Sequence, residues 1–228
     1  MPVRRIFRRT FGVATRLSWG GGVGSQVPAH SFQQYLRFFG LRPNRHIYLC
    51  PQTLFKFHPE FDLLLAGILE ADPEGDLILI EGRVPEWTNR LRRRWETNLP
   101  NAAQRVQFLP AQPRDDFLAL LECSDVVLDP IHFGGGNTSY EALGRGAAVV
   151  TLPGNLLRSR ITTALYRKMG LEELIAHNAD SYVQLSVRLA TDARFRASVV
   201  DQIVNSSGAL FEDPQEVRCL QSWLLSVV

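Results

Sequence analysis

From His46 onward, short β-rich runs alternate with longer amphipathic segments, and this rhythm limits the possible folds more than any other feature. Such alternation predicts parallel strands joined by right-handed helical crossovers, with helices on both faces of the sheet. We therefore expect a doubly wound, Rossmann-like α/β domain. The predicted strands are 47–50, 77–80, 105–109, 125–128 and 147–152. The predicted helices are 59–71, 85–98, 113–122, 137–145 and 156–169, followed by helical segments near 179–190, 193–205 and 214–226.

The charge of the 228-residue chain is unevenly divided. Residues 1–59 carry a balance of +9, and the remainder carries −7. A uniformly basic domain would favour nucleic-acid binding. Because the excess positive charge is confined to residues 1–59 and the rest of the chain is mildly acidic, we expect no nucleic-acid partner.

Residues 1–28 differ from the rest of the chain, because scattered arginines precede a glycine cluster at 20–24. We expect this leader to be disordered or outside the fold, and residues 29–228 to form the domain. A transit-type peptide, a membrane-surface helix or an anion-binding arm are the alternatives. The leader lacks the apolar core of a secretory signal.

The cysteines Cys50, Cys123 and Cys219 lie far apart and form no CxxC pair. We interpret them as small buried side chains in a reducing compartment, which predicts a cytoplasmic protein. A disulfide framework or a structural zinc site is not expected.

Ligands of parallel sheets bind beyond the carboxyl ends of the strands. The strongest candidate there is DPIHFGGGNTSYE, residues 129–141, which follows a strand and opens a helix. Its three glycines let the backbone approach a ligand closely, and the helix start favours a phosphate. An ordinary glycine turn with an asparagine cap is the alternative. The predicted binding residues here are Gly136, Asn137, Thr138 and Ser139 at the phosphate, and Glu141 at the hydroxyls of a ribose.

A second candidate, CPQTLFK, follows the first strand and contains Lys56, one of only two lysines in the chain. A compact ammonium at this edge suits a diphosphate, because it offsets the charge that grows on a leaving group. A surface lysine is the alternative.

A third candidate, LPAQPRDDF, follows the strand 105–109. Backbone around Ala111 and Gln112 could read a base edge, and Arg114 or Phe117 could cover the ring. A polar loop leading into a helix is the alternative. Arg158 and Arg160 follow the fifth strand, where helix-surface arginines are an equally good interpretation.

Several motifs are missing from the sequence. It contains no P-loop, no HExxH, no His/Cys grouping, no GxSxG elbow and no acidic DxD-type metal loop. We therefore expect no metal and no cofactor, with Lys56 and helix N–H groups stabilising the leaving group. His58 and His132 are interpreted as loop or capping histidines, and His58 as a base is a weaker alternative.

Three stretches together resemble the C-terminal, donor-binding domain of the O-linked N-acetylglucosamine transferase family, glycosyltransferase family 41, and its bacterial relatives. They are CPQTLFKFHPEFD, LDPIHFGGGNTSYEALGRGAAVVTLPG and RSRITTALYRKMGLEELI, and the likeness runs from about Arg45 to about Phe211. The resemblance implies one half of a GT-B enzyme, whose two Rossmann-like domains face each other across a cleft. It implies an inverting, metal-independent hexosyl transfer from a uridine diphosphate sugar to a protein or peptide.

On this resemblance, Lys56 looks like the catalytic lysine that contacts the diphosphate, with Gln52 nearby. Ala111, Gln112 and Arg114 would read the uracil. The nucleocytoplasmic branch of the family has histidine where this chain has Asn137, whereas bacterial protein glucosyltransferases have asparagine. The donor is therefore either UDP-N-acetylglucosamine or UDP-glucose.

The family's acceptor-recruiting repeats and N-terminal catalytic domain precede the region of likeness, where this chain has only about 45 residues. We expect the isolated chain to be an incomplete and inactive glycosyltransferase. Two alternatives stay open. The first is a binding module, which either binds a UDP-sugar without catalysis or is a fragment that works only with a separate acceptor-domain chain. The second is a structural remnant anchored by residues 1–28.

Overall fold

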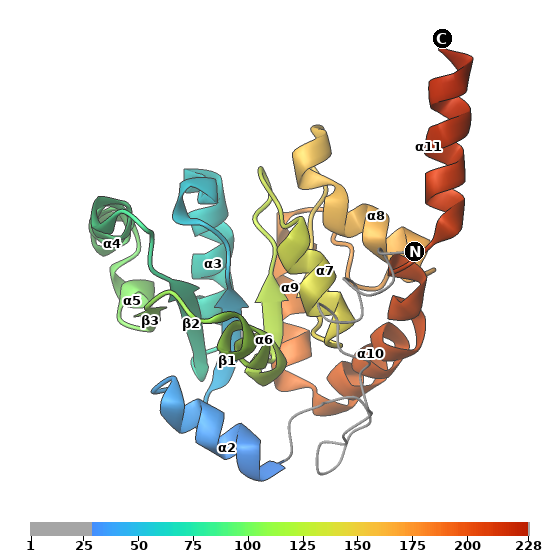
Figure 1. Ribbon diagram of the computed structural model, residues 1–228. Coiled ribbons are helices and arrows are strands. Elements are labelled where there is room, and N and C mark those ends of the chain that lie inside the picture. Colours follow the sequence, from blue (N-terminus) through green and yellow to red (C-terminus); the bar gives the residue numbers. More distant parts are fainter. Residues whose placement is uncertain (1–28, 228) are drawn as a thin grey trace.

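A five-stranded sheet forms the centre of the protein, of which a computed structural model describes residues 29–227. All neighbouring strands are parallel, in the order β3-β2-β1-β4-β5 (Figure 1). This arrangement confirms the predicted doubly wound α/β class. The strands are β1 (His46–Cys50), β2 (Gly75–Ile80), β3 (Val106–Leu109), β4 (Val126–Leu128) and β5 (Val149–Val150).

The chain changes direction across the sheet between β1 and β4. It runs from β1 through β2 to β3 on one side, and then returns to β4 and β5 on the other. The loops that leave two neighbouring strands at such a switch point form the usual ligand site of open α/β sheets. The loops after β1 and β4 are therefore the expected position of a ligand site.

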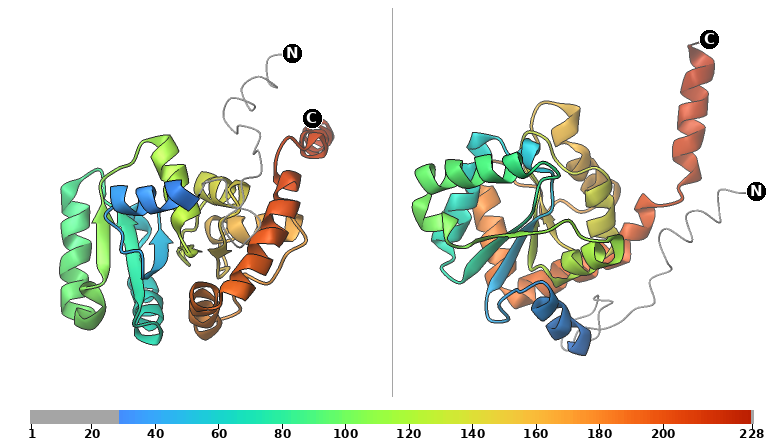
Figure 2. Two further views of the ribbon diagram at one scale, coloured as in Figure 1. Left: turned by 90° about the horizontal axis from the view of Figure 1, so that it is seen from below. Right: turned by 60° about the vertical axis from the view of Figure 1, so that its left-hand side comes forward.

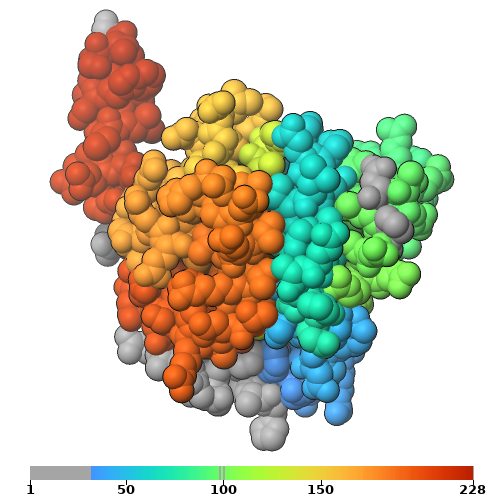
Figure 3. All heavy atoms as spheres, turned by 180° about the vertical axis from the view of Figure 1, so that it is seen from behind, coloured from blue at the N-terminus to red at the C-terminus, as the bar shows by residue number. Residues whose placement is uncertain are grey.

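Helices cover both faces of the sheet. On one face, α3 (Pro59–Ala71) packs against α9 (Ala179–Thr191), and Figure 3 shows them side by side. On the other face, α6 (Arg114–Cys123) contacts α7 (Asn137–Gly144). Because β1 and β2 are covered on both sides, their residues are almost all apolar and buried. Four further α-helices accompany these: α4 (Pro85–Asn98), α5 (Pro100–Ala103), α8 (Ile161–Lys168) and α10 (Ala193–Ser206).

Two predicted helices, 59–71 and 85–98, are confirmed to the residue. Each begins with proline, whose missing N–H and fixed φ suit the first helical position. The predicted helix 156–169 is wrong in its first part, where a 3₁₀ turn, η2 (Leu157–Ser159), precedes α8. The reason is a non-local bond: Gly134 N–H donates to the Arg158 carbonyl at 2.9 Å, which fastens this segment to the glycine loop.

The sequence did not predict helix α2 (Ala29–Phe38), which contacts α6 and buries Leu36. The predicted strand 147–152 is also too long, because only Val149 and Val150 form regular ladder pairs. The predicted leader, 1–28, lies outside the described residues.

The C-terminal helix α11 (Pro214–Ser226) projects from the body, as Figure 1 and the right-hand view of Figure 2 show. Lys168 fastens its start through bonds to Asp213 and Glu216 at 3.0 and 2.7 Å. None of its residues is buried. Within residues 29–227, no helix combines the length and the hydropathy that a membrane crossing requires.

The three cysteines are free thiols. Cys50 and Cys123 are buried as predicted, and burial raises the pKa of both. Cys219 lies exposed on α11, so the expectation of burial is wrong for this residue. None of the residues of its helix is buried, so Cys219 shares the exposure of the whole element.

Candidate functional site

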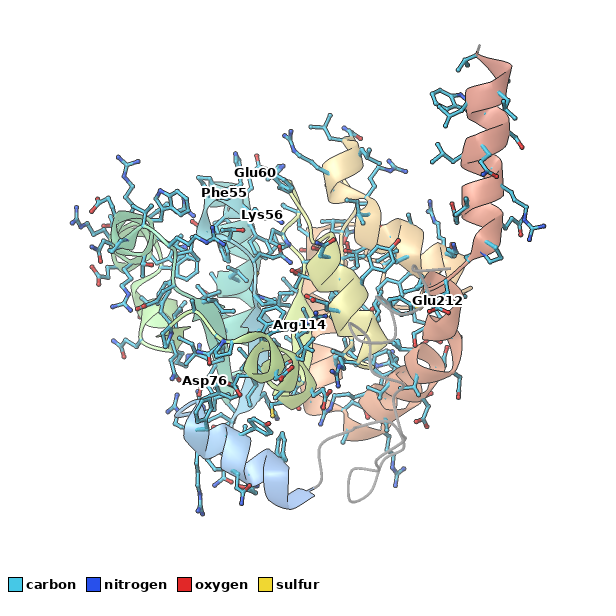
Figure 4. The ribbon with its side chains drawn as sticks, viewed as in Figure 1. Phe55, Lys56, Glu60, Asp76, Arg114 and Glu212 are labelled. Atoms are coloured by element: carbon cyan, nitrogen blue, oxygen red, sulfur yellow. The ribbon has the colours of Figure 1, made fainter. Side chains whose placement is uncertain are left out.

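Lys56 lies in the loop after β1, at the end of the 3₁₀ turn η1 (Leu54–Lys56). Its ammonium donates to Gln52 Oε1 at 2.7 Å and to the Gly134 carbonyl at 2.9 Å. The fold thus brings the predicted lysine to the predicted glycine loop, although 78 residues separate Lys56 from Gly134. Figure 4 shows Lys56 among the loops near the start of α3. An ammonium has three N–H donors, so one is left for a ligand oxygen.

The surroundings of Lys56 are partly apolar. Its ammonium lies 4.5 Å from the centre of the Phe133 ring, within the range of a cation–π contact. Burial lowers the pKa of Lys56, while the nearby Asp129 carboxylate opposes this shift. A half-buried cation of this kind interacts with an anionic ligand more strongly than a fully solvated one would.

The glycine loop packs too closely for side chains at its first two positions. A β-carbon on Gly134 would stand 2.8 Å from Asp129 Oδ2. A β-carbon on Gly135 would overlap Ser139 Oγ and stand 2.9 Å from Gln52 Nε2. Gly136 has no atom within 4 Å of such a position. Gly134 and Gly135 therefore serve internal packing, and Gly136 is the glycine that leaves space open.

Asp129 holds this loop in place, although it was not among the predicted site residues. It follows β4 directly and is 3% exposed. Its carboxylate accepts from Gly135 N–H at 2.6 Å and from Thr151 Oγ at 2.8 Å. The Tyr182 hydroxyl donates to its main-chain carbonyl at 3.0 Å. An aspartate directly after a buried strand was the signal that could have identified it.

Burial raises the pKa of Asp129, although the hydrogen bonds from Gly135, Thr162 and Thr151 oppose this effect. An acid whose pKa is raised in the folded state loses its proton at a lower pH in the unfolded chain than in the folded protein. Stability therefore falls as pH rises from the unfolded pKa, about 3.9, to the folded one. Each tenfold difference between the two acidity constants corresponds to about 1.4 kcal/mol of stability.

We expect Asp129→Asn to remove this contribution. Urea unfolding between pH 4 and 8 should show the stability of the variant rising relative to the original protein as pH increases. Asp180→Asn, which changes an exposed aspartate at the start of α9, should give a nearly constant difference. A constant or opposite trend for Asp129→Asn would contradict the raised pKa.

Helix α7 begins at Asn137, directly after the open Gly136. Its first N–H groups have no acceptor within the helix, so this helix start is suited to an anion. Asn137 is exposed and Thr138 half-buried, which leaves both accessible. Ser139 is different, because its hydroxyl bonds Thr162 Oγ1 at 2.8 Å and its N–H donates to the Gly136 carbonyl. The predicted role of Ser139 at a phosphate thus gains no support from its own contacts.

The predicted base-reading residues lie at the start of α6. Arg114 is the first residue of that helix, and its guanidinium is 3.6 Å from Glu141 Oε1 on α7. Ala111 is exposed, and Gln112 donates to the Pro110 carbonyl at 2.7 Å. Arg114 and Glu141 therefore form one pair across α6 and α7. The roles of these four residues at a nucleoside stay predictions.

Three aromatic side chains that were not predicted as site residues surround the lysine loop. The Phe55 ring is 5.8 Å from Trp87 and 6.2 Å from Phe133, and Phe55 is 62% exposed. Arg158 donates to the His132 carbonyl at 3.2 Å, and its guanidinium lies 5.9 Å from the Phe133 ring. No local pattern distinguishes these aromatics from core residues, because only the fold leaves Phe55 and Phe133 exposed and packs Trp87 partly against the core.

The predicted capping role of His58 is confirmed, since its Nδ1 accepts from Glu60 N–H at the start of α3. The sequence shows no His/Cys grouping for a metal. The fold nevertheless brings His58, Glu60 and His132 together, with one possible ligand atom from each within 4.8 Å of the others.

Known proteins to which this chain is similar are glycosyltransferases by name. A family model described as Glycosyl transferase family 41 matches residues 10–218. A protein of Arabidopsis thaliana named "Probable UDP-N-acetylglucosamine--peptide N-acetylglucosaminyltransferase SPINDLY" is 32% identical over 162 residues, 68% of this chain and 18% of the relative. A "UDP-glucose:protein N-beta-glucosyltransferase" of Actinobacillus pleuropneumoniae serotype 5b is 30% identical over 100 residues, 43% of this chain and 16% of the relative.

Among solved structures, a mutant of the Thermobaculum terrenum O-GlcNAc transferase aligns with a TM-score of 0.68 and 32% identity. The match covers 75% of this chain and 34% of that chain. This chain therefore spans less than a fifth of the two curated relatives and about a third of the solved relative.

Proposed function

The chain belongs to glycosyltransferase family 41, and from this premise we propose that it is the half of the enzyme that binds a uridine diphosphate sugar. The family and the similarity to an O-GlcNAc transferase establish a glycosyltransferase domain with one half of the GT-B fold. The donor, the reaction course and the acceptor are part of the proposal.

One observation carries the proposal: the Lys56 ammonium donates a hydrogen bond to the Gly134 carbonyl, in the loop that leads into α7. A diphosphate here would meet the remaining N–H of the ammonium on one side and the first N–H groups of α7 on the other. Both features favour negative charge. Gln52 holds the ammonium and is itself buried, so the cation is positioned before a ligand arrives.

In the proposed reaction, an acceptor hydroxyl or amide attacks the anomeric carbon from the side opposite the diphosphate and inverts this centre. The bond between the sugar and the diphosphate breaks, and the acceptor's proton passes to solvent. Negative charge grows on the leaving diphosphate, and Lys56 stabilises it. Asn137 and Thr138 hold the phosphates at the helix start. Because stabilisation of the leaving group comes from groups of the chain itself, the proposed step is metal-independent.

The nucleoside would extend from α7 towards α6. Ala111 and Gln112 would meet the uracil, and Glu141 would accept from the ribose hydroxyls. The Arg114–Glu141 ion pair supports this assignment, because it fixes both side chains at the junction of the two helices. For the sugar, the two curated relatives differ in the donor that their names state, so the proposed donor is UDP-glucose or UDP-N-acetylglucosamine.

The acceptor would be a protein or peptide held by regions that the longer relatives have and this match does not cover. We propose that the isolated chain binds the donor and transfers sugar only when such a region is supplied. A cytoplasmic location agrees with its free thiols.

Calorimetry with UDP, ADP and GDP tests the binding role. We expect UDP to bind, and ADP and GDP to bind at least about tenfold more weakly, a difference of about 1.4 kcal/mol. Equal affinities for the three nucleotides would contradict a uracil-reading loop at Ala111 and Gln112. Complete absence of UDP binding to the folded chain would contradict the donor-binding role itself.

A further inference from the structure

The cluster of His58, Glu60 and His132 has the composition of a transition-metal site. His58 caps α3, Glu60 lies in its first turn, and His132 comes from the loop after β4. His132 Nε2 and Glu60 Oε2 are 2.8 Å apart, and the centres of the two imidazole rings are 4.2 Å apart. Figure 4 labels Glu60 near Lys56, at the edge of the sheet where the glycine loop also lies.

Two imidazoles and one carboxylate are typical ligands of Zn²⁺ and similar borderline ions, whereas Mg²⁺ and Ca²⁺ prefer oxygen ligands. Around a tetrahedral zinc with bonds near 2.0–2.1 Å, neighbouring ligand atoms lie roughly 3.3–3.5 Å apart. The three candidate ligand atoms are within 4.8 Å of one another, so a shift of about an ångström completes the site. The Glu60 and His132 side chains are 65% and 42% exposed, which allows that shift.

Three features oppose a cation here: the positive start of α3, the ammonium of Lys56, and Arg158, which bonds the His132 carbonyl. The Glu60 carboxylate offsets part of this charge. Coordination through Nδ1 of His58 would replace its contact with Glu60 N–H, which at 3.3 Å is longer than an ordinary hydrogen bond, whereas coordination through Nε2 would keep that contact. Coordination bonds from two imidazoles and a carboxylate outweigh this weak contact.

We propose that His58, Glu60 and His132 bind one Zn²⁺ ion, with a fourth position left to water. The ion joins the loop after β1 to the loop after β4, the same two loops that Lys56 and Gly134 connect. It takes no part in the proposed sugar transfer, and its binding does not depend on the donor assignment.

Calorimetric titration of the metal-free full chain with ZnCl₂ tests the site. We expect one ion per chain, and a loss of affinity of at least about tenfold in His132→Ala, Glu60→Gln and His58→Asn. Asparagine at position 58 keeps a capping group, so the start of α3 is preserved. His177→Ala, which removes another exposed histidine, should bind Zn²⁺ like the original chain. Absent binding, or equal binding by all variants, would overturn the proposal.

Co²⁺ provides a second measurement, because it absorbs visible light strongly in four-coordinate sites and weakly in the octahedral aqua ion. We expect the intense bands with the original chain and with His177→Ala, and their loss in His132→Ala. A weak, octahedral-type spectrum for the original chain would overturn the tetrahedral assignment. UDP titrations of the same metal-free samples report separately on the donor site, so failure of one proposal is distinguishable from failure of the other.

Discussion

Lys56→Ala is expected to weaken UDP binding about 5- to 150-fold, which corresponds to about 1–3 kcal/mol for the loss of a charged hydrogen bond. The ammonium is positioned by Gln52 and Gly134 before any ligand binds, and it is partly shielded from water. A diphosphate therefore gains most of the interaction, because little reorganisation is needed. Calorimetry with UDP measures the loss directly.

Lys168→Ala is the matched control, because Lys168 is the only other lysine of the chain. It is the last residue of α8 and bonds Asp213 and Glu216 at the start of α11, away from the loops of the candidate site. We expect this variant to bind UDP like the original chain. Removing Lys56 also leaves Gln52 and the Gly134 carbonyl without a donor, so urea unfolding of both variants is needed to separate binding from folding. Unchanged UDP affinity in a folded Lys56→Ala protein would remove Lys56 from the site.

Gly135→Ala is expected to lower the free energy of unfolding by about 1–3 kcal/mol, the usual cost of overpacking a close contact. The new methyl group would overlap Ser139 Oγ and approach Gln52 Nε2 to 2.9 Å. Movement of Gly135 would also break its 2.6 Å bond to the Asp129 carboxylate. Because Gln52 is a hydrogen-bond partner of Lys56, UDP affinity should fall together with stability.

The control for this change is Gly208→Ala, where the added carbon meets no atom within 4 Å and the residue is exposed. Its free energy of unfolding should stay within about 0.5 kcal/mol of the original value. Denaturant unfolding of both variants provides the comparison. If Gly135→Ala were as stable as Gly208→Ala, the glycine loop would not be packed as tightly as its contacts with Ser139 and Asp129 imply.

These expectations share one structural cause, the packing of the loop after β4 onto the loop after β1. Asp129 fixes the glycine loop through Gly135, and Gly134 in turn receives Lys56. A donor site built on loops needs such internal bonds. Without them, the loops would have to become ordered when the ligand binds, and the free-energy cost of this ordering would weaken binding. The bond from Gly134 N–H to the Arg158 carbonyl adds a third segment to the same assembly.

The starts of helices, and the strands that helices cover on both faces, could be predicted from local patterns. Pro59 and Pro85 mark the first residues of α3 and α4, and unbroken apolar runs mark strands that are covered on both faces. The 3₁₀ turn at Leu157–Ser159 could not be predicted, because its cause is a bond to Gly134 more than twenty residues earlier. Ser139 has a hydroxyl group and a position near a helix start that suit a phosphate ligand, yet the fold directs this hydroxyl to Thr162.

By itself, the sequence determined the α/β class and the edge of the sheet at which ligands would bind. Alternating strands and helices allow few other arrangements, and the carboxyl ends of parallel strands always share an edge. Only the tertiary structure decided which residues meet there: Lys56 with Gly134, Arg114 with Glu141, and His58 with His132. Strand order and side-chain contacts arise from packing between distant segments, and such packing leaves no periodic trace in the chain.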